Sequence, residues 1–462
     1  MTEEKLLNAV DALAEQNVHI SSLIIDDNWQ DINDSGKSQY HHGWNAFEAQ
    51  PKAFPNGLKN TVSRIRERHS SIKHVAVWHA LLGYWGGISP EGKLAQTYKT
   101  VDVIRENNPK RDIDLQGHIT VIAKEDVSKF YDDFYRFLSE SGIDAVKADV
   151  QFIVDTLASA KDRRELTTTY LDAWMIATLR HFSSRAISCM SQAPQILFHQ
   201  QLPRSRLPLL VRNSDDFFPH VPASHPWHIW ANAHNSLLTQ HLNVLPDWDM
   251  FQTVHDFSGF HAAARCLSGG PIYITDAPRE YNFDIINQIT GQTPRGNTVI
   301  FRPSVVGKSI DHYNDYHDNV ILKLGSYHGR AATGTPLLGI FNVSQQPLRE
   351  LIPLSKLPGV LPSTSYVVRA HNTGVVTPVM RPGSDTAYLP VVLDIRGFDI
   401  LTAFPLTEFD SSTRGKIYTA NLGLVGKMTG AAAITSNEIS ILHNNSRVFL
   451  DTRLKALGVL GE

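Results

Sequence analysis

A lysine and an aspartate two residues apart are the first feature of this sequence that could do chemistry. Lys147 and Asp149 close a short β-rich run, so on a strand both side chains point to one face. A nearby ammonium favours an ionised carboxylate, and a glycosidase nucleophile must be an ionised carboxylate. A structural ion pair is the competing interpretation of this spacing, because ion pairs also perturb carboxylates that have no catalytic purpose.

A second source of carboxylates is the run Arg212-Asn213-Ser214-Asp215-Asp216. If this run stays extended, Arg212 and Asp216 share a face, which favours Asp216 over Asp215 as the functional acid. Two adjacent carboxylates can move each other's pKa values apart, and a carboxyl group that stays protonated near neutral pH can act as a general acid. The alternative is a surface salt bridge.

An earlier run ends in Asp26 and Asp27, followed by Trp29. Ionised carboxylates accept hydrogen bonds from neighbouring sugar hydroxyls, and a tryptophan face covers the C–H side of a pyranose. Either aspartate could instead cap a following helix, since aspartate is a favoured N-cap residue.

Two other patterns invite interpretations that the sequence does not support. The histidine-rich stretch 225–261 has no HExxH helix and no paired cysteine ligands, so we expect packing and hydrogen bonding there and neither a metal nor a cofactor. The glycines of LLGYWGG (81–87) lack the spacing of a nucleotide-binding loop. Tyr84 and Trp85 within it are therefore either sugar contacts or core residues.

The composition argues against several classes of partner. Lysine and arginine total 43 against 46 aspartates and glutamates, so no positive excess exists to neutralise nucleic acid or an anionic membrane. A polar, acidic N-terminus, and the lack of any run of about 18 apolar residues, favour a cytoplasmic protein without a membrane segment. Cys189 and Cys266 lie in apolar segments, so no disulfide framework is expected. The oligomeric state is left open.

The elements that must position these residues alternate between short apolar runs and helical stretches. Residues 2–17 have the cap and the apolar stripe of a helix, and helical periodicity returns at 126–139 and 156–182. Apolar runs that end in polar residues lie at 19–25, 74–79, 143–149, 186–192, 207–216, 242–249 and 271–276. Buried strands alternating with helices, with functional groups at the strand ends, predict a parallel barrel with its site at that end.

The number of apolar runs, and a change in the sequence pattern near residue 297, define the expected domains. The sequence shows seven runs, whereas a closed barrel of this type has eight strands. We therefore expect an α/β fold of the (β/α)8 TIM-barrel type that lacks its first strand, which would lie upstream of Met1. From about residue 297, short alternating segments at 337–343, 364–370 and 391–401 predict antiparallel β structure. The expected domains are a barrel over 1–300 and an antiparallel β-sandwich over 301–462.

Several of these segments, in this order over residues 20 to 345, resemble one branch of glycoside hydrolase family 36 in clan D. The branch contains raffinose synthases, alkaline α-galactosidases and seed imbibition proteins. The matching segments are IIDDNWQ, VWHALLGYWGG, GIDAVKADVQ, RNSDDFFP, HPWHIWANAHNSL, PDWDMFQ and FHAAARCLSGGPIYITD, with LLGIFNV matching more loosely.

The resemblance implies a retaining double displacement on an α-galactoside such as a raffinose-family oligosaccharide. Asp149 would be the nucleophile and Asp216 the acid/base, with Asp215 as its alternative. The implied substrate-binding residues are Asp26, Asp27, Trp29, Trp78, Trp85, Lys147, Arg212 and Asp249. No cofactor is implied, and transfer to water or to a second sugar remains open. The family's N-terminal β domain and its GW-x-TWD-like first strand have no counterpart here, so a non-catalytic carbohydrate-binding or structural fragment is the alternative.

Overall fold

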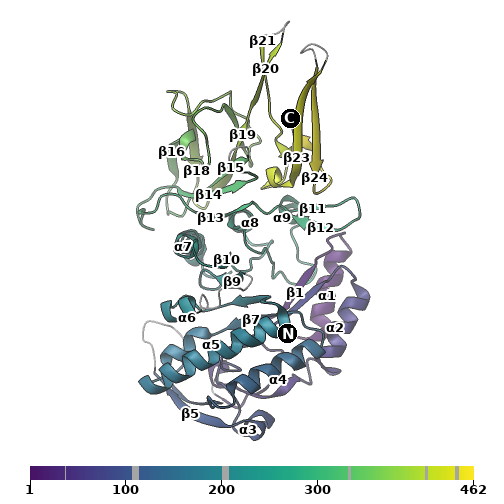
Figure 1. Ribbon diagram of the computed structural model, residues 1–462, viewed down its shortest axis with the longest axis vertical. Helices are drawn as coiled ribbons and strands as arrows, with labels where there is room; N and C mark the ends of the chain where they lie inside the picture. The colour runs from purple at the N-terminus through teal and green to yellow at the C-terminus, as the bar shows by residue number, and fades with distance from the viewer. Residues whose placement is uncertain are drawn as a thin grey trace. The chain divides into compact units, whose positions relative to one another are not determined.

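The computed structural model describes residues 1–36, 38–106, 114–199, 208–330, 334–411, 415–442 and 447–461 (Figure 1). These residues form two compact units. Unit 1 comprises Met1–Arg212 and Leu242–Leu245, and unit 2 comprises Asn213–His241 and Pro246–Glu462.

A parallel sheet forms the centre of unit 1. Its strand order is β1 (Ser22–Ile25), β4 (His74–Ala80), β7 (Ala145–Asp149), β8 (Ala186–Ser188), β9 (Leu209–Arg212) and β10 (Val244–Asp247), of which β10 ends in unit 2. The pairs β1/β4, β4/β7, β7/β8 and β8/β9 are all parallel. Because parallel strands end at the same edge of a sheet, Asp149 and Arg212, which close β7 and β9, lie along one edge.

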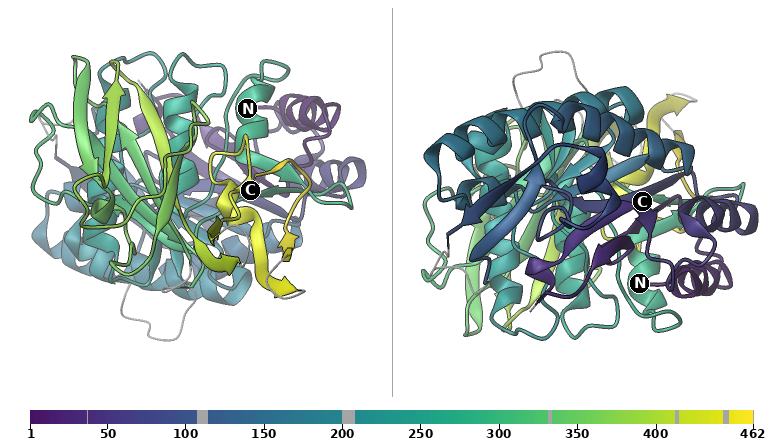
Figure 2. Two further views of the ribbon diagram at one scale, coloured as in Figure 1. Left: turned by 90° about the horizontal axis from the view of Figure 1, so that it is seen from above. Right: turned by 90° about the horizontal axis from the view of Figure 1, so that it is seen from below.

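The helices of unit 1 form where the sequence places caps and apolar stripes. They are α1 (Glu3–Ala14), α2 (Gly57–Arg68), α3 (Lys93–Thr97), α4 (Val127–Glu140), α5 (Ala160–Phe182) and α6 (Pro194–His199). Thr2 caps α1 by accepting a hydrogen bond from the Lys5 amide at 3.3 Å, which confirms the predicted first helix. The long helices α4 and α5 pack side by side on the strands (Figures 1 and 2).

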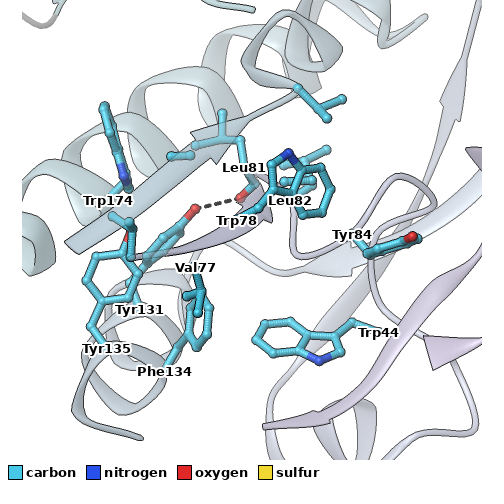
Figure 3. Packing of buried hydrophobic residues seen from close by; sticks show 14 of the residues in the cluster. Trp44, Val77, Trp78, Leu81, Leu82, Tyr84, Tyr131, Phe134, Tyr135 and Trp174 are labelled. Atoms are coloured by element: carbon cyan, nitrogen blue, oxygen red, sulfur yellow. Dashed lines mark hydrogen bonds between the residues drawn. The ribbon is translucent and has the colours of Figure 1, made fainter. Parts of the chain in front are cut away.

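Aromatic side chains fill the space between these helices and the sheet. Trp44 packs on Phe134 of α4 with ring centroids 4.6 Å apart. Tyr131 of the same helix donates a hydrogen bond to the Leu81 carbonyl at 2.6 Å (Figure 3). This bond ties α4 to the chain that leaves the end of β4, where Trp78 and Trp85 lie.

Two antiparallel hairpins that the sequence analysis did not predict interrupt the alternation of strands and helices. The first joins β2 (Gln30–Asn33) to β3 (Gly43–Ala49), and the second joins β5 (Thr100–Arg105) to β6 (Gly117–Ile122). The GYWGG segment is held between them. Gly87 accepts a hydrogen bond from the Trp44 amide, and Ile88 donates one to Thr120. The hairpins therefore fix the loop that carries Trp85.

The run at 271–276, predicted as the seventh strand, is not a strand of the sheet. It forms only an isolated bridge between Phe251 and Ile274. The run begins at Pro271, which has no amide hydrogen to donate, and two backbone hydrogen bonds join it to Phe251. The sheet therefore contains six of the seven predicted runs.

The described residues of unit 2 include three α-helices and paired antiparallel strands. The helices are α7 (Ser224–Thr239), α8 (Ser258–Ser268) and α9 (Phe283–Ile289). The main sheet has the order β13 (Val305–Ser309), β14 (Leu322–His328), β15 (Thr335–Phe341), β19 (Phe398–Pro405) and β17 (Tyr366–Ala370). The antiparallel character predicted beyond residue 297 is confirmed.

Two-stranded antiparallel sheets also lie in unit 2. They are β11 (Thr290–Gln292) with β12 (Thr298–Ile300), β16 (Leu348–Pro353) with β18 (Tyr388–Leu393), β20 (Thr407–Ser411) with β21 (Gly415–Thr419), β22 (Gly423–Leu424) with β25 (Leu460–Gly461), and β23 (Ile434–Leu442) with β24 (Arg447–Leu454). The β16/β18 pair and the main sheet share one hydrophobic cluster. The segment predicted at 391–401 contains parts of two strands, because Gly397 turns the chain by donating to Asp394.

Candidate active site

Asp149 ends β7 with its carboxylate held on both oxygens. Trp78 Nε1 donates to Oδ2 at 2.8 Å, and the Val150 amide donates to Oδ1 at 2.7 Å. Asp149 is buried, with 7% of its surface exposed. Val150 has φ 55°, a left-handed conformation that is costly for a β-branched residue. The chain therefore turns sharply directly after the carboxylate, and local strain accompanies its orientation.

Lys147 lies on the same face of β7 and pairs with the end of β1. Its Nζ lies 2.7 Å from Asp26 Oδ2, and its side chain is 6% exposed against 41% for Asp26. Burial by itself would lower the pKa of Lys147, but the nearby Asp26 and Asp149 carboxylates outweigh it and raise the pKa. The ammonium therefore stays charged between two carboxylates.

Asp27 contacts the aromatic residues of the GYWGG loop. Trp85 Nε1 donates to Asp27 Oδ2 at 3.2 Å, and burial raises the pKa of Asp27. The rings of Trp78 and Trp85 are stacked with centroids 6.4 Å apart. Strand β2, and not a helix, follows this segment, so the structure argues against the helix-cap interpretation of Asp26 and Asp27.

Arg212 reaches the same region from the end of β9 through Cys189. Arg212 Nη1 donates to Cys189 Sγ at 3.5 Å, and both side chains are buried. Burial raises the pKa of the Cys189 thiol, and the neighbouring Asp149 carboxylate adds to this effect. The sequence analysis assigned Cys189 to apolar core, and its position after β8 was the only available sign of its place beside Lys147 and Asp149.

Trp29 does not share the setting of Trp85. It is fully buried, and its Nε1 donates to the Trp78 carbonyl at 2.6 Å. Trp29 therefore lies in the core, where it holds the backbone carbonyl of Trp78. Its ring has no exposed face on which a sugar could stack.

In unit 2, the segment that carries Asp215 and Asp216 bends. Strand β9 ends at Arg212, and Ser214 Oγ donates to the Asp215 carbonyl at 2.9 Å, so the assumption of an extended run is wrong. The bend leaves Asp215 exposed and Asp216 partly buried. Partial burial therefore distinguishes Asp216 from Asp215. The expectation that alternate residues of an extended strand share a face does not apply to this bend.

Asp249 braces this bend. Its Oδ2 accepts a hydrogen bond from the Phe217 amide at 2.7 Å, and its own amide donates to Asp247 Oδ1 at 3.0 Å. Asp249 is fully buried with φ 64°. The structure thus places Asp249 under the turn next to Asp216, with no surface for direct contact with a ligand.

The histidine-rich stretch forms a packed cluster in unit 2. His225 Nδ1 lies 2.9 Å from His261 Nε2, and Arg265 contacts both His261 and His228. Burial lowers the pKa of His225 to about 4 and that of His261 well below its usual value. No group of three or more His, Cys, Asp or Glu side chains that could hold a metal ion occurs in the described part of the chain. Nor do the described residues include a helix long and apolar enough to cross a membrane.

Comparison with known proteins adds a family and a fold. A family model described as raffinose synthase or seed imbibition protein Sip1 matches residues 39–302. Probable galactinol–sucrose galactosyltransferase 6 of Arabidopsis thaliana is 34% identical over 310 residues, covering 63% of this chain and 40% of the relative. Probable galactinol–sucrose galactosyltransferase 1 of the same plant is 26% identical over an alignment that covers 100% of this chain and 66% of the relative. The chain thus spans less than two thirds of the length of both.

Two solved structures share its fold at low sequence identity. α-Galactosidase I of Mortierella vinacea has a TM-score of 0.54 at 14% identity, covering 87% of this chain and 93% of the other. A β-L-arabinopyranosidase of Geobacillus stearothermophilus has a TM-score of 0.59 at 13% identity, covering 87% and 92%. The described architecture is therefore the α-galactosidase type, with a parallel sheet followed by a mostly β region.

Proposed function

Because this chain belongs to the raffinose synthase and seed imbibition protein family, we propose that it is a retaining enzyme that transfers galactosyl groups from α-galactosides. Raffinose-family oligosaccharides are the proposed substrates, with water or a second sugar as the acceptor. The names of the relatives, which are galactinol–sucrose galactosyltransferases and a stachyose synthase, favour a sugar acceptor.

The observation that carries this proposal is the setting of Asp149. Its carboxylate lies at the end of a parallel strand, where Trp78 donates a hydrogen bond to one oxygen and the Val150 amide donates one to the other. Hydrogen bonds to both oxygens fix the direction from which the carboxylate can attack. We propose that Asp149 attacks the anomeric carbon as the bond to the leaving oxygen breaks.

We assign the proton transfers to Asp216, as the family resemblance implies. Asp216 gives its proton to the leaving oxygen in the first step. In the second step its carboxylate takes a proton from the incoming water or sugar hydroxyl, which displaces Asp149 from the anomeric carbon. Partial burial supports Asp216 over the exposed Asp215, because substrate-binding sites are concave and partly enclosed.

Asp26 and Asp27 are the proposed galactose contacts. Lys147 donates to Asp26 Oδ2 and the Asp27 amide donates to Asp26 Oδ1 at 2.9 Å. The carboxylate still keeps 41% of its surface exposed, and each oxygen has a second lone pair that can accept from a sugar hydroxyl. Asp27 is joined to the Trp85 indole, which places a carboxylate and an aromatic ring side by side.

The nucleophile assignment is tested with the purified 462-residue chain on raffinose, on galactinol plus sucrose, and on an aryl α-galactoside. The Asp149→Asn variant should lose turnover by on the order of 10⁴-fold or more. Asp155→Asn is the matched control, because Asp155 is an exposed aspartate six residues further along the chain. A fluorinated galactosyl fluoride that slows the second step should label Asp149, detected as added mass on its peptide. Equal turnover in both variants would remove the proposed nucleophile.

The acid/base assignment needs a different readout. The Asp216→Ala variant should lose far more activity on raffinose than on an aryl galactoside with an acidic phenol, which leaves without protonation. Asp215→Ala provides the adjacent control and should show no such dependence on the leaving group. Reversal of this pattern would assign the role to Asp215. Sugar binding without turnover by the unaltered chain would instead favour a non-catalytic carbohydrate-binding protein.

A further inference from the structure

The packed histidine cluster of unit 2 surrounds the residue that directly follows the proposed acid/base. This residue, Phe217, is buried with 4% of its surface exposed. Its ring lies among four imidazole rings at centroid distances between 4.9 and 6.4 Å, those of His225, His228, His255 and His261. The cluster therefore holds the side chain next to Asp216, although the proposed reaction gives none of its histidines a role.

The main chain of Phe217 is held separately, by the turn that follows β10. Its amide donates a hydrogen bond to Asp249 Oδ2 at 2.7 Å. This amide belongs to the planar peptide group that joins Asp216 to Phe217, so the bond also restrains the Cα atom of Asp216. Asp249 itself has φ 64°, a left-handed conformation that is uncommon outside glycine. The position of the Asp249 carboxylate therefore depends on the contacts that hold this turn.

The fully buried Arg265 of α8 holds the turn through its guanidinium. Nε donates to the Asp249 carbonyl and Nη2 to the Met250 carbonyl, each at 2.7 Å. Nη1 donates to the carbonyl of His261 in its own helix at 3.2 Å, which ties the turn to α8. A guanidinium presents its donors in a rigid planar fork, whereas an ammonium is a point charge on a flexible stem. A lysine at this position should therefore hold the two consecutive carbonyls less firmly.

The same guanidinium contacts the histidine cluster. Nη1 lies 3.2 Å from His261 Nδ1, and Nη2 lies 3.1 Å from His228 Nε2. His261 Nε2 in turn lies 2.9 Å from His225 Nδ1. Three of the four imidazoles around the Phe217 ring are thus joined to Arg265, directly or through one further hydrogen bond. Arg265 is therefore connected both to the ring of Phe217 and, through the turn, to its amide.

We propose that Arg265 is a positioning residue for the acid/base. It holds the Asp249 turn and the histidine cluster in the arrangement that fixes Phe217, and Phe217 fixes the adjacent Asp216. The inference rests on the proposed function, and within it on the assignment of Asp216. A displacement of about 1 Å in a reacting group can cost on the order of 10²-fold in rate. Arg265, which is fully buried and cannot touch the substrate, therefore affects the reaction through Asp216 alone.

The readout is the dependence of kcat/KM on the leaving group, because a merely structural defect lowers turnover of all substrates alike. Raffinose needs a proton on its leaving oxygen, whereas an aryl α-galactoside with an acidic phenol does not. Arg265→Lys should lower kcat/KM on raffinose by roughly 10- to 100-fold, and on the aryl galactoside by much less. An equal loss on both substrates overturns the proposal.

Lys323→Met is the matched control. Lys323 is a buried cation of the same unit, and its partners are Asp311 at 3.0 Å and Glu350 at 2.7 Å. Its replacement should lower the thermal midpoint, as that of Arg265 should, and leave the ratio of the rates on the two substrates unchanged. A change in this ratio as large as that in Arg265→Lys would assign the effect to general destabilisation and overturn the proposal.

A double-mutant cycle tests whether Arg265 acts through Asp216. In the Asp216→Ala background the acid is absent, so adding Arg265→Lys should not raise the ratio of aryl-galactoside to raffinose kcat/KM any further. A ratio that rises by the same factor in both backgrounds overturns the proposal, because Arg265 would then act independently of Asp216.

Phe217→Leu is a second route to the same test, and it is available even if Arg265→Lys does not fold. The variant keeps an apolar side chain but removes the ring from the histidine cluster, so it should show the same selective loss on raffinose. Phe341→Leu is its control, because Phe341 is buried in the same hydrophobic cluster and its ring packs on Phe260 and Phe398. Equal substrate ratios in the two leucine variants would contradict the positioning role.

Failure of this inference and failure of the proposed function give different results. If the unaltered chain turns over both substrates, and Asp216→Ala shows the leaving-group dependence while Arg265→Lys does not, the positioning role is overturned and the function stands. If the unaltered chain turns over neither substrate, the proposed function is contradicted and the inference fails with it.

Discussion

The hydrogen bond from Trp78 to Asp149 provides a quantitative test of the proposed nucleophile. Replacing Trp78 with phenylalanine keeps an aromatic ring on β4 and removes the N–H that donates to Oδ2 at 2.8 Å. A hydrogen bond to a charged group contributes about 1.5–3 kcal/mol. If this bond holds the carboxylate in its attacking orientation, losing it should lower kcat/KM by roughly 10- to 150-fold, at 1.36 kcal/mol for each factor of ten.

The assay is kcat/KM on an aryl α-galactoside, measured for the Trp78→Phe variant and a matched control. Trp44→Phe is the control, because Trp44 is equally buried in the same cluster and its Nε1 has no hydrogen-bond partner among the described residues (Figure 3). Both variants remove the same atoms from the core, so both should lower the thermal midpoint. Only Trp78→Phe should lower kcat/KM by the amount given above.

Equal kcat/KM in the two variants, with each variant folded, would contradict this prediction. Such a result would mean that the Trp78 donor does not orient the attacking carboxylate, or that the attacking group is not Asp149.

Three further predictions concern stability. Gly57 and Gly87 have φ 75° and 77°, but only at Gly87 would a new Cβ overlap a backbone carbonyl, so Gly87→Ala should cost about 1–3 kcal/mol more unfolding free energy than Gly57→Ala in urea titrations. Burial lowers the pKa of His79 from 6.5 to about 4, so folding stability is held above pH 6.5 and falls by about 3 kcal/mol as the pH drops through 4. His79→Gln should flatten that dependence in unfolding curves at pH 7 and pH 4.5, and an unchanged slope would assign it to other groups. Asp26→Asn should lower the free energy of unfolding by at least about 1 kcal/mol more than Lys147→Met does. The first variant leaves a buried ammonium without its partner, whereas the second leaves a carboxylate that water can reach. The reverse order of stability in denaturant titrations would contradict this prediction.

The positions of the sheet strands were predictable because buried parallel strands are short, continuous apolar runs. The predictions at 74–79 and 143–149 lie within two residues of β4 and β7. The run at 271–276 is as rich in β-forming residues as the runs that became strands, but it forms only a bridge to Phe251. Strand pairing depends on contacts between distant segments, which the composition of one run does not show. The two hairpins were missed for a related reason. Each forms a two-stranded sheet outside the parallel sheet, and no strand was predicted in either segment.

The candidate site was predictable where strand alternation holds and not beyond it. Lys147 and Asp149 lie on β7 and share a face, as their spacing indicated. The same rule was wrong for the run that ends in Asp216, because β9 stops at Arg212 and the chain then bends. Trp29 is two residues from Asp27 in the sequence and Trp85 is far from it, yet the fold buries Trp29 in the core and brings Trp85 into contact with Asp27.

The hydrogen bonds that define the site join residues far apart in the sequence. The bonds Trp78–Asp149, Lys147–Asp26 and Trp85–Asp27 span 71, 121 and 58 residues. Each bond therefore forms only after separate strands or loops of unit 1 have reached their final register. The site is absent from an unfolded chain.

This dependence explains why buried residues without chemistry of their own matter to the site. Trp29 holds the carbonyl of Trp78, and the Trp78 side chain holds Asp149, so one run of hydrogen bonds leads from the core to the carboxylate. Because each link is short and buried, a shift of the strand that carries Trp78 would be transmitted to the carboxylate with little loss. The position of the proposed nucleophile thus depends on the packing of the whole sheet. The sequence motif shows only the carboxylate itself and not the residues that hold it.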